Sequence, residues 1–285
     1  MKTRVISGLS FGMLGIAIVV LTFSPLPDFV VYTIGLMSVY ELMKVFGVVN
    51  KLMYVFGIGF SASLITYMAY SDKLGISVNP VLALIIYFVA MLMLTLVDFG
   101  RTTFNHAALS AFASMALPGA LGCFLKMRNM VDEYGDVLTR GHMRFLLWFC
   151  LAGAVFSDTF ALFAGVKFGK HKLSPRISPK KTVEGLIGGV LGSAVINIIA
   201  LFICNAVCYK PFPLPIWLMV LVSLAVPLVG TLGDLTASAI KRSYGIKDFG
   251  NLIPGHGGIM DRMDSISFVA PFVYAVLYIY LELTV

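Results

Sequence analysis

Charged residues are scarce in this chain: Asp, Glu, Lys and Arg make up 12% of its 285 residues, and 59% are hydrophobic. Soluble globular proteins contain about 25% charged and about 45–50% apolar residues. The shortage of charge therefore excludes an ordinary soluble domain and indicates a polytopic membrane protein. No extramembrane domain exists to gather the net charge of +7 on one surface, so nucleic acid is not an expected partner.

Cysteine is also scarce, with four residues that all lie in apolar runs. Cys204 and Cys208 are four residues apart on one helix face, a spacing that invites a metal hypothesis. No histidine or carboxylate lies near them in the sequence, so we expect small buried apolar side chains and no disulfide.

Long apolar runs dominate the rest of the chain. They are continuous rather than alternating, and backbone in hydrocarbon must satisfy its own hydrogen bonds, so helices are expected rather than barrel strands. The first run has no small-residue cleavage site before Pro25, which predicts a retained span rather than a signal peptide. The predicted fold is all-α, a single membrane domain over residues 1–285. Its nine expected spans are residues 5–23, 29–46, 52–71, 77–97, 103–125, 143–165, 183–207, 214–238 and 265–284.

Most of the 21 Lys and Arg residues fall on one side if the N-terminus is cytoplasmic and the spans alternate. Cations prefer the cytoplasmic side, so we expect an integral protein of the cytoplasmic (inner) membrane with its N-terminus inside. Segment 126–144 is the exception, because it places four cations outside. A half-span hidden in that segment would change the number of helices.

Two carboxylates lie inside expected spans with no cation one helical turn away. Asp158 and Asp234 each carry a cost of about 2.5–3.5 kcal/mol for an acid at the centre of a span, which indicates a partner or a function.

Two other acids have simpler interpretations. Glu41 is expected to pair with Lys44 at the i, i+3 spacing, and Asp98 is expected to pair with Arg101 at a helix end.

Polar residues are concentrated in KDFGNLIPGHGGIMDRMDS, residues 247–265, just before the last apolar run. Helical spacing places Asp234, Ser238 and Lys241 on one stripe upstream of it, and Asp261 and Asp264 on one face if the last helix has begun there. One acid would be enough to cap a helix. Carboxylates that converge in a wet pocket repel each other unless a cation lies between them, and such oxygen ligands suit Mg²⁺.

Cations and glycines accompany these acids. Guanidinium and ammonium groups suit phosphate oxygens, and glycines let backbone N–H groups approach an anion closely. This combination is typical of phosphoryl or nucleotidyl transfer. The residues concerned are Lys241, Arg242, Lys247, Arg262, Gly255, Gly257 and Gly258.

The loop of residues 166–182 is also basic. SPKKTVEG predicts a helix start with Ser178 as N-cap and Pro179 in the first turn, and a helix N-terminus beside Lys180 and Lys181 favours an anion. The preference for cytoplasmic cations alone also explains a basic loop here.

His256 is a candidate general base, but a phosphate nucleophile is already ionised near neutral pH. A hydrogen bond to phosphate or a structural role is therefore expected. No Ser–His–acid or Cys–His arrangement is visible, which counts against acyl transfer and proteolysis.

SAIKRSYGIKDFGNLIPGHGGIMDRMDS resembles the signature of the phosphatidate cytidylyltransferase (CDP-diacylglycerol synthase) family. The upstream GDLT and SDTFALFAGVKFGKHKLSPRISPKKTVEG also resemble that family, so the resemblance covers residues 155–265. Ala237 stands where the family often has Glu, and Phe160 stands where glycine is common, which leaves the pocket shape open.

The resemblance implies that CTP and phosphatidate, a membrane lipid, react to CDP-diacylglycerol and pyrophosphate. It implies that Mg²⁺ binds, as one or two divalent cations, and a second cation of another type is left open. It also implies that the active site faces the cytoplasm. The expected metal ligands are Asp234, Asp261 and Asp264, and Asp158 either ligates metal or orients a lysine. The expected catalytic residues are Lys241, Arg242, Ser238, Asp248 (also a further ligand candidate) and His256. The expected substrate-binding residues are Lys180, Lys181, Arg176, Lys247, Arg262, Gly257 and Gly258.

On this interpretation residues 1–142 form scaffold and lipid-groove helices, and residues 143–285 form the catalytic helices and cytoplasmic loops. A CTP-dependent lipid kinase or a polyprenyl-phosphate transferase would use similar groups. An anion transporter with coupling ions at Asp158 and Asp234 is a further alternative. The oligomeric state is open, a homodimer included.

Overall fold

The computed structural model describes residues 12–252 and 257–284. Residues 12–20 are helical, and the later elements follow in chain order. They are α2 (Leu26–Val45), α3 (Lys51–Leu74), α4 (Pro80–Val97), α5 (Phe104–Glu133), α6 (Arg140–Phe168), β1 (Lys172–Ser174), β2 (Ser178–Thr182), α7 (Val183–Val207), α8 (Ile216–Ser243), α9 (Met260–Met263) and α10 (Ile266–Thr284).

Eight of the described helices are long and apolar enough to cross a membrane. They correspond to the second to ninth expected spans, so the prediction of an all-α polytopic membrane protein is confirmed. The first expected span, residues 5–23, lies partly outside the described residues, and the total of nine stays a prediction.

Polar side chains just before the helices explain where several of them begin. Asn50 and Asn79 accept hydrogen bonds from the first turns of α3 and α4. Thr103 and Thr139 form capping boxes with the histidines three residues later, at the starts of α5 and α6. Each cap satisfies backbone N–H groups that have no partner within the helix.

The predicted helix start at Ser178 and Pro179 is wrong. Residues 178–182 form strand β2, which pairs antiparallel with β1 through Lys172–Thr182 and Ser174–Ser178. Helix α7 begins at Val183, where Thr182 accepts a hydrogen bond from Gly185 N at 3.1 Å. The hairpin supplies backbone partners that the local sequence pattern does not reveal.

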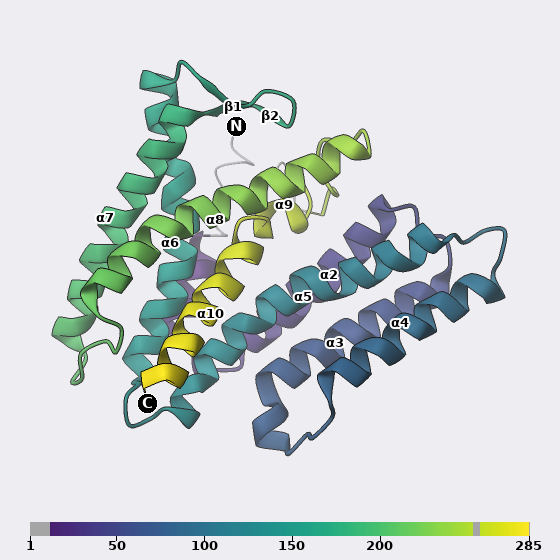
Figure 1. The fold of residues 1–285 in the computed structure, drawn as a ribbon, viewed down its shortest axis with the longest axis horizontal. Helices are drawn as coiled ribbons and strands as arrows, with labels where there is room; N and C mark the ends of the chain where they lie inside the picture. Colours follow the sequence, from purple (N-terminus) through teal and green to yellow (C-terminus); the bar gives the residue numbers. More distant parts are fainter. Residues whose placement is uncertain (1–11, 253–256, 285) are drawn as a thin grey trace.

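The helices form two groups. Helices α6, α7 and α8 pack together on one side, α2 to α5 pack around α5 on the other, and α10 contacts α5, α6 and α8 between them (Figure 1). Gly189 lies so close to α6 that a Cβ there would be 2.8 Å from Ser157 O. Small residues at such a contact let two membrane helices approach closely.

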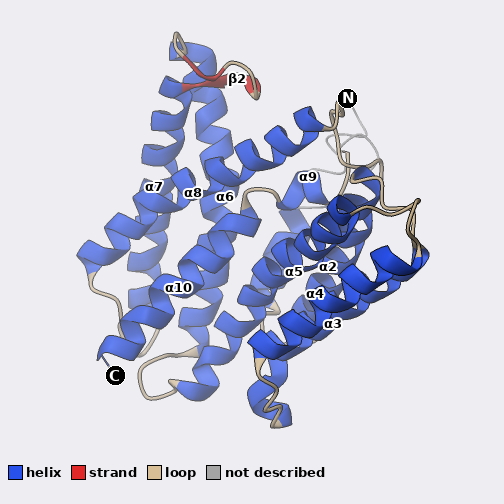
Figure 2. Cartoon of the chain, turned by 45° about the vertical axis from the view of Figure 1, so that its right-hand side comes forward, coloured by secondary structure: helices blue, strands red, loops and turns tan. Residues whose placement is uncertain are grey.

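The β1–β2 hairpin lies at one end of the bundle, at the start of α7 (Figure 2). Short helix α9 lies between the ends of α8 and α2, also towards the hairpin end (Figure 1). Residues from both halves of the chain therefore reach this end of the molecule.

Segment 126–144 contains no half-span, since α5 continues to Glu133 and α6 begins at Arg140. Two of its four cations have acid partners: Lys126 Nζ lies 2.7 Å from Asp72 Oδ2, and Arg128 Nη2 donates to Asp28 Oδ1 at 3.1 Å. Arg140 and Arg144 lie over the ring of Phe23 instead. The acid partners therefore offset part of the positive charge that made this segment an exception.

The predicted Asp98–Arg101 salt bridge is wrong, because no ion pair joins these two described residues. Asp98 ends α4, and its carboxylate accepts a hydrogen bond from Asn50 Nδ2 at 3.2 Å. The carboxylate thus links α4 to the start of α3, and the backbone carbonyl of Asp98 closes the local turn by accepting from Arg101 N.

Candidate active site

Acidic and basic side chains meet where α8, the hairpin and the turn before α10 come together. Lys181 Nζ forms an ion pair with Asp234 Oδ2, which brings β2 onto α8. Ser238 Oγ lies one helical turn further along α8 and donates to Asp234 Oδ1 at 3.4 Å. These three predicted residues are therefore neighbours, although Lys181 is distant in the sequence.

Asp264 lies next to this group, and Ser265 N donates to its Oδ1 at 2.8 Å. Burial first, and then the negative charges of Asp234 and Asp158, raise the pKa of Asp264 to about 7. Asp158, on α6, is also within electrostatic reach of Lys181 and Asp234. The charges of the three carboxylates therefore act on one another, but their oxygens do not all lie within 4.8 Å of one another in the described structure.

Asp261 has a different environment. Its Oδ1 lies 2.6 Å from Lys241 Nζ, and its Oδ2 accepts hydrogen bonds from Phe249 N at 2.8 Å and Gly258 N at 3.0 Å. The side chains are nearly enclosed, with 5% of Asp261 and 12% of Lys241 exposed. This carboxylate therefore joins α8 to two segments, residues 249–252 and 257–260, of the glycine loop that follows α8.

Glu41 is a site residue that sequence reasoning missed. It is 3% exposed, and its Oε2 accepts a hydrogen bond from Met260 N at 3.1 Å. Its expected partner Lys44 is exposed and makes no ion pair with it among the described residues, so that prediction is wrong. An acid inside an apolar run was the available signal, but the nearby lysine offered a simpler explanation.

A basic cavity of about 340 Å³ opens beside Asp158, between the end of α6, the hairpin and α7. Asp158 itself is accessible from this cavity. Its other polar lining residues are Lys172, Lys180, Lys181, Thr182 and Thr231.

The remaining predicted residues surround these groups. Arg242 Nε donates to Ile177 O at 3.4 Å and ties the end of α8 to the hairpin. Gly257 has φ +83°, a conformation that glycine adopts most easily, and a Cβ there would lie 2.9 Å from Asp261 Oδ2. His256 and Gly255 lie outside the described residues. The exposed members of the predicted set are Asp158, Arg176, Lys180, Arg242, Lys247, Asp248 and Arg262.

An apolar cavity of about 580 Å³ reaches the same region. It lies between the helical residues 12–19, α2, α5 and α6, and Arg262 and Met263 of α9 are part of its lining. Arg128, which is paired with Asp28, also belongs to the lining. Arg262 comes from the same short helix as Asp261, so it places a positive charge where the apolar cavity approaches the acidic residues.

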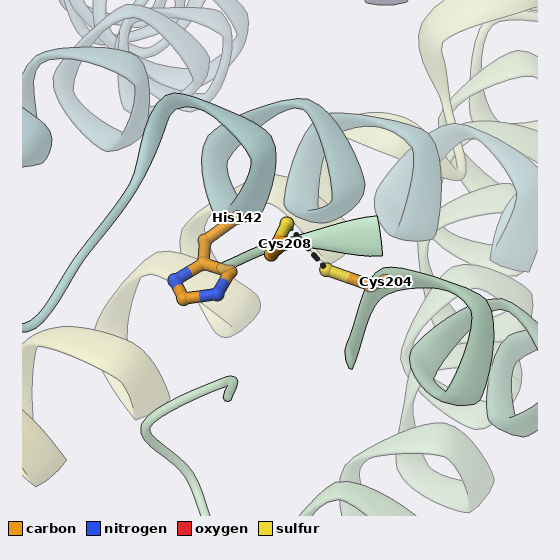
Figure 3. A group of neighbouring side chains, drawn as sticks. All are labelled: His142, Cys204 and Cys208. Carbon is orange, nitrogen blue, oxygen red and sulfur yellow. Dashed lines mark hydrogen bonds between the residues drawn. The ribbon is translucent and has the colours of Figure 1, made fainter. Parts of the chain in front are cut away.

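The cysteine pair has a neighbour that the sequence did not reveal. His142 lies beside Cys204 and Cys208, whose sulfur atoms are 3.7 Å apart (Figure 3). His142 Nε2 lies 2.9 Å from Lys210 O, which only accepts, so Nε2 carries the proton, and Nδ1 accepts from Thr139 N at 3.3 Å. Both nitrogens are engaged in capping α6 and holding the loop after α7. The cysteines are free thiols, as expected.

Fold and site together define a class: a helical membrane protein with a carboxylate- and lysine-lined site between a basic and an apolar cavity. The sequence matches the cytidylyltransferase family over residues 2–280. The chain belongs to that family.

Individual relatives agree. The phosphatidate cytidylyltransferase of Bacillus subtilis (strain 168) is 31% identical over 290 residues, which cover 97% of each chain. The phosphatidate cytidylyltransferase of Staphylococcus haemolyticus is 49% identical over 115 residues, 40% of this chain and 42% of that protein. The enzyme of the same name from Staphylococcus aureus (strain COL) is 45% identical over 115 residues, with the same two coverages.

Proposed function

We propose that this protein is a phosphatidate cytidylyltransferase, which transfers the CMP unit of CTP to phosphatidate and releases pyrophosphate. The observation that carries the proposal is that two cavities border one cluster of interacting charges: Asp158 lines the basic cavity, Arg262 lines the apolar one, and the two charges act on each other. A basic cavity suits the triphosphate, and an apolar cavity beside Arg262 suits the acyl chains of a lipid phosphate. The family and the similar full-length enzyme of Bacillus subtilis support the same activity.

The triphosphate is proposed to bind along the hairpin. Lys172, Lys180 and Lys181 line the basic cavity, and their ammonium groups can neutralise phosphate oxygens. Arg242 lies at the hairpin and joins this group. The hydroxyl of Ser238, which donates to Asp234 at the edge of the same site, would turn from Asp234 to donate to a phosphate oxygen.

The donor set fits Mg²⁺. Burial and the negative charges of Asp234 and Asp158 raise the pKa of Asp264, so the three carboxylates lie within electrostatic reach of one another. Hard carboxylate oxygens are the ligands that Mg²⁺ takes. Asp261 completes the proposed set, because its Oδ1 accepts one bond, from Lys241, and retains a lone pair. When bound, Mg²⁺ would offset the charge of the departing pyrophosphate.

The residues of the chain are proposed to position the two substrates and to neutralise the charge of their phosphates. The phosphate of the lipid is ionised near neutral pH, so it can attack the α-phosphorus of CTP without a general base. The oxygen–phosphorus bond to CMP forms as the bond to pyrophosphate breaks. Lys241, paired with Asp261, and Arg262, at the apolar cavity, are proposed to stabilise the charge that develops on the phosphates during transfer.

The proposed orientation places the hairpin end of the bundle in the cytoplasm. The hairpin and its cavity are rich in lysine, and cytoplasmic loops favour lysine and arginine. CTP is water-soluble and would enter from that side. The protein is therefore proposed to lie in the cytoplasmic membrane with its active site facing inward.

The test uses purified protein in detergent with phosphatidate, Mg²⁺ and CTP labelled at the α-phosphate. Label should enter the lipid phase, and it should stop entering on chelation and in Asp234→Asn. Asp72→Asn is the matched control, because Asp72 also pairs with a lysine but lies on the exposed ion pair with Lys126. Label that stays in water with folded wild-type protein would reject the proposal. Transfer from γ-labelled CTP instead would identify a lipid kinase.

A further inference from the structure

Glu41 contacts the glycine loop at two points. A Cβ on Gly250 would lie 2.5 Å from Glu41 Oε1, and one on Gly258 would lie 2.6 Å from Oε2. Neither distance is possible for real atoms without movement. These two glycines therefore make room for a carboxylate that comes from α2, in the half of the chain that carries no other proposed catalytic group.

The burial of Glu41 is not explained by stability. Its Oε2 accepts a hydrogen bond from Met260 N, the backbone N–H of Ile259 also interacts with the carboxylate, and its Oε1 has no hydrogen-bond partner among the described residues. A buried polar atom without a partner is destabilising, and more so when the group is charged. An apolar side chain would avoid this cost, so the carboxylate indicates a role other than packing.

Glu41 and Asp261 hold the same two segments of the loop, residues 249–252 and 257–260. Asp261 accepts hydrogen bonds from Phe249 N and Gly258 N, and Glu41 lies against the adjoining Gly250 and Gly258. The two segments touch each other, because a Cβ on Gly258 would lie 2.8 Å from Gly250 N. A change at Glu41 is therefore transmitted to the carboxylate that Lys241 pairs with.

We propose that Glu41 is a positioning residue for the transfer reaction: its carboxylate fixes the glycine loop so that Asp261 and Lys241 are aligned with the site. The inference rests on the proposed cytidylyltransferase activity. Glu41 touches no reacting atom in this account. It acts through Met260 N and the two glycines.

A double-mutant cycle tests the inference. Gly250 does not have a positive φ, so Gly250→Ala is strained chiefly by the collision with Glu41. We expect Glu41→Ala and Gly250→Ala each to lower kcat about tenfold or more, with the KM for CTP changing less than kcat. Glu41→Ala removes the oxygen that the new methyl group would meet. The double variant should therefore be no slower than Glu41→Ala alone.

Two further variants keep the test decisive. Glu41→Gln preserves the size of the side chain but removes its negative charge, so it should also lose activity. Glu282→Gln, at the far end of α10, is the matched control for loss of a glutamate charge and should keep wild-type activity.

Two results would overturn the inference: losses of Glu41→Ala and Gly250→Ala that multiply, or wild-type kcat in both Glu41 variants. Absence of CDP-diacylglycerol from the wild-type protein and the Glu282→Gln control alike would instead reject the activity itself. The two failures are therefore distinguishable.

Discussion

Replacing Asp261 by Asn should nearly abolish activity while the helical bundle stays folded. The carboxylate accepts three bonds, from Lys241 Nζ, Phe249 N and Gly258 N. An amide has one acceptor oxygen, so its N–H₂ group must face either Lys241 or the two backbone donors. Some buried donor then loses its partner whichever way the amide turns.

The expected fall in kcat follows from the burial of the Asp261–Lys241 ion pair. Breaking one side of a buried ion pair costs about 3–5 kcal/mol, because the remaining charge stays buried without compensation. Only 12% of Lys241 and 5% of Asp261 are exposed, so little of that cost is relieved by water. If the loop must hold the wild-type geometry during transfer, kcat should fall by at least about 100-fold, at 1.36 kcal/mol per factor of ten.

The assay measures CDP-diacylglycerol formation at saturating CTP and Mg²⁺ for wild type, Asp261→Asn, Lys241→Met and the double variant. Because the two residues act as one pair, the double variant should be about as slow as the slower single variant. Circular dichroism and thermal unfolding in detergent confirm that the helices persist. Asp261→Asn protein with more than half of the wild-type kcat would refute the reasoning.

Three other changes test separate parts of the structure. Asp28→Asn leaves Arg128 buried without its acid partner and should lower the free energy of unfolding by about 3–5 kcal/mol. The melting temperature should fall while kcat at low temperature stays near normal, and an unchanged melting temperature would contradict the buried pair. Lys181→Ala removes the cation on Asp234 and should raise the KM for CTP about tenfold or more, whereas an unchanged KM would move the triphosphate away from the hairpin. Val155→Trp fills part of the apolar cavity and should slow long-chain phosphatidate more than a short-chain analogue in the same label-transfer assay; equal slowing would place the acyl chains elsewhere.

Sequence alone could predict which residues belong to much of the candidate site, because these residues cluster in two polar stretches of an apolar chain. Asp234, Ser238 and Lys181 do meet, and Asp264 does join them. Which of these residues form ion pairs with each other was harder to predict from the sequence. Sequence spacing gave no reason to place Lys181 on Asp234, since the hairpin that carries Lys181 was mistaken for the start of a helix.

The sequence by itself determined the class of the protein and the approximate positions of its second to ninth expected spans, although α5 runs on to Glu133, beyond the expected end at residue 125. Transfer of a segment into hydrocarbon is roughly additive along the chain, and caps such as Thr103 and Thr139 act over three residues, so both can be recognised locally. Tertiary structure alone decided that Glu41 lies under the glycine loop, with its hydrogen bond to Met260 spanning 219 residues. The reason is that such a contact depends on how α2 packs against α9 beside the end of α8, and no local pattern encodes that packing.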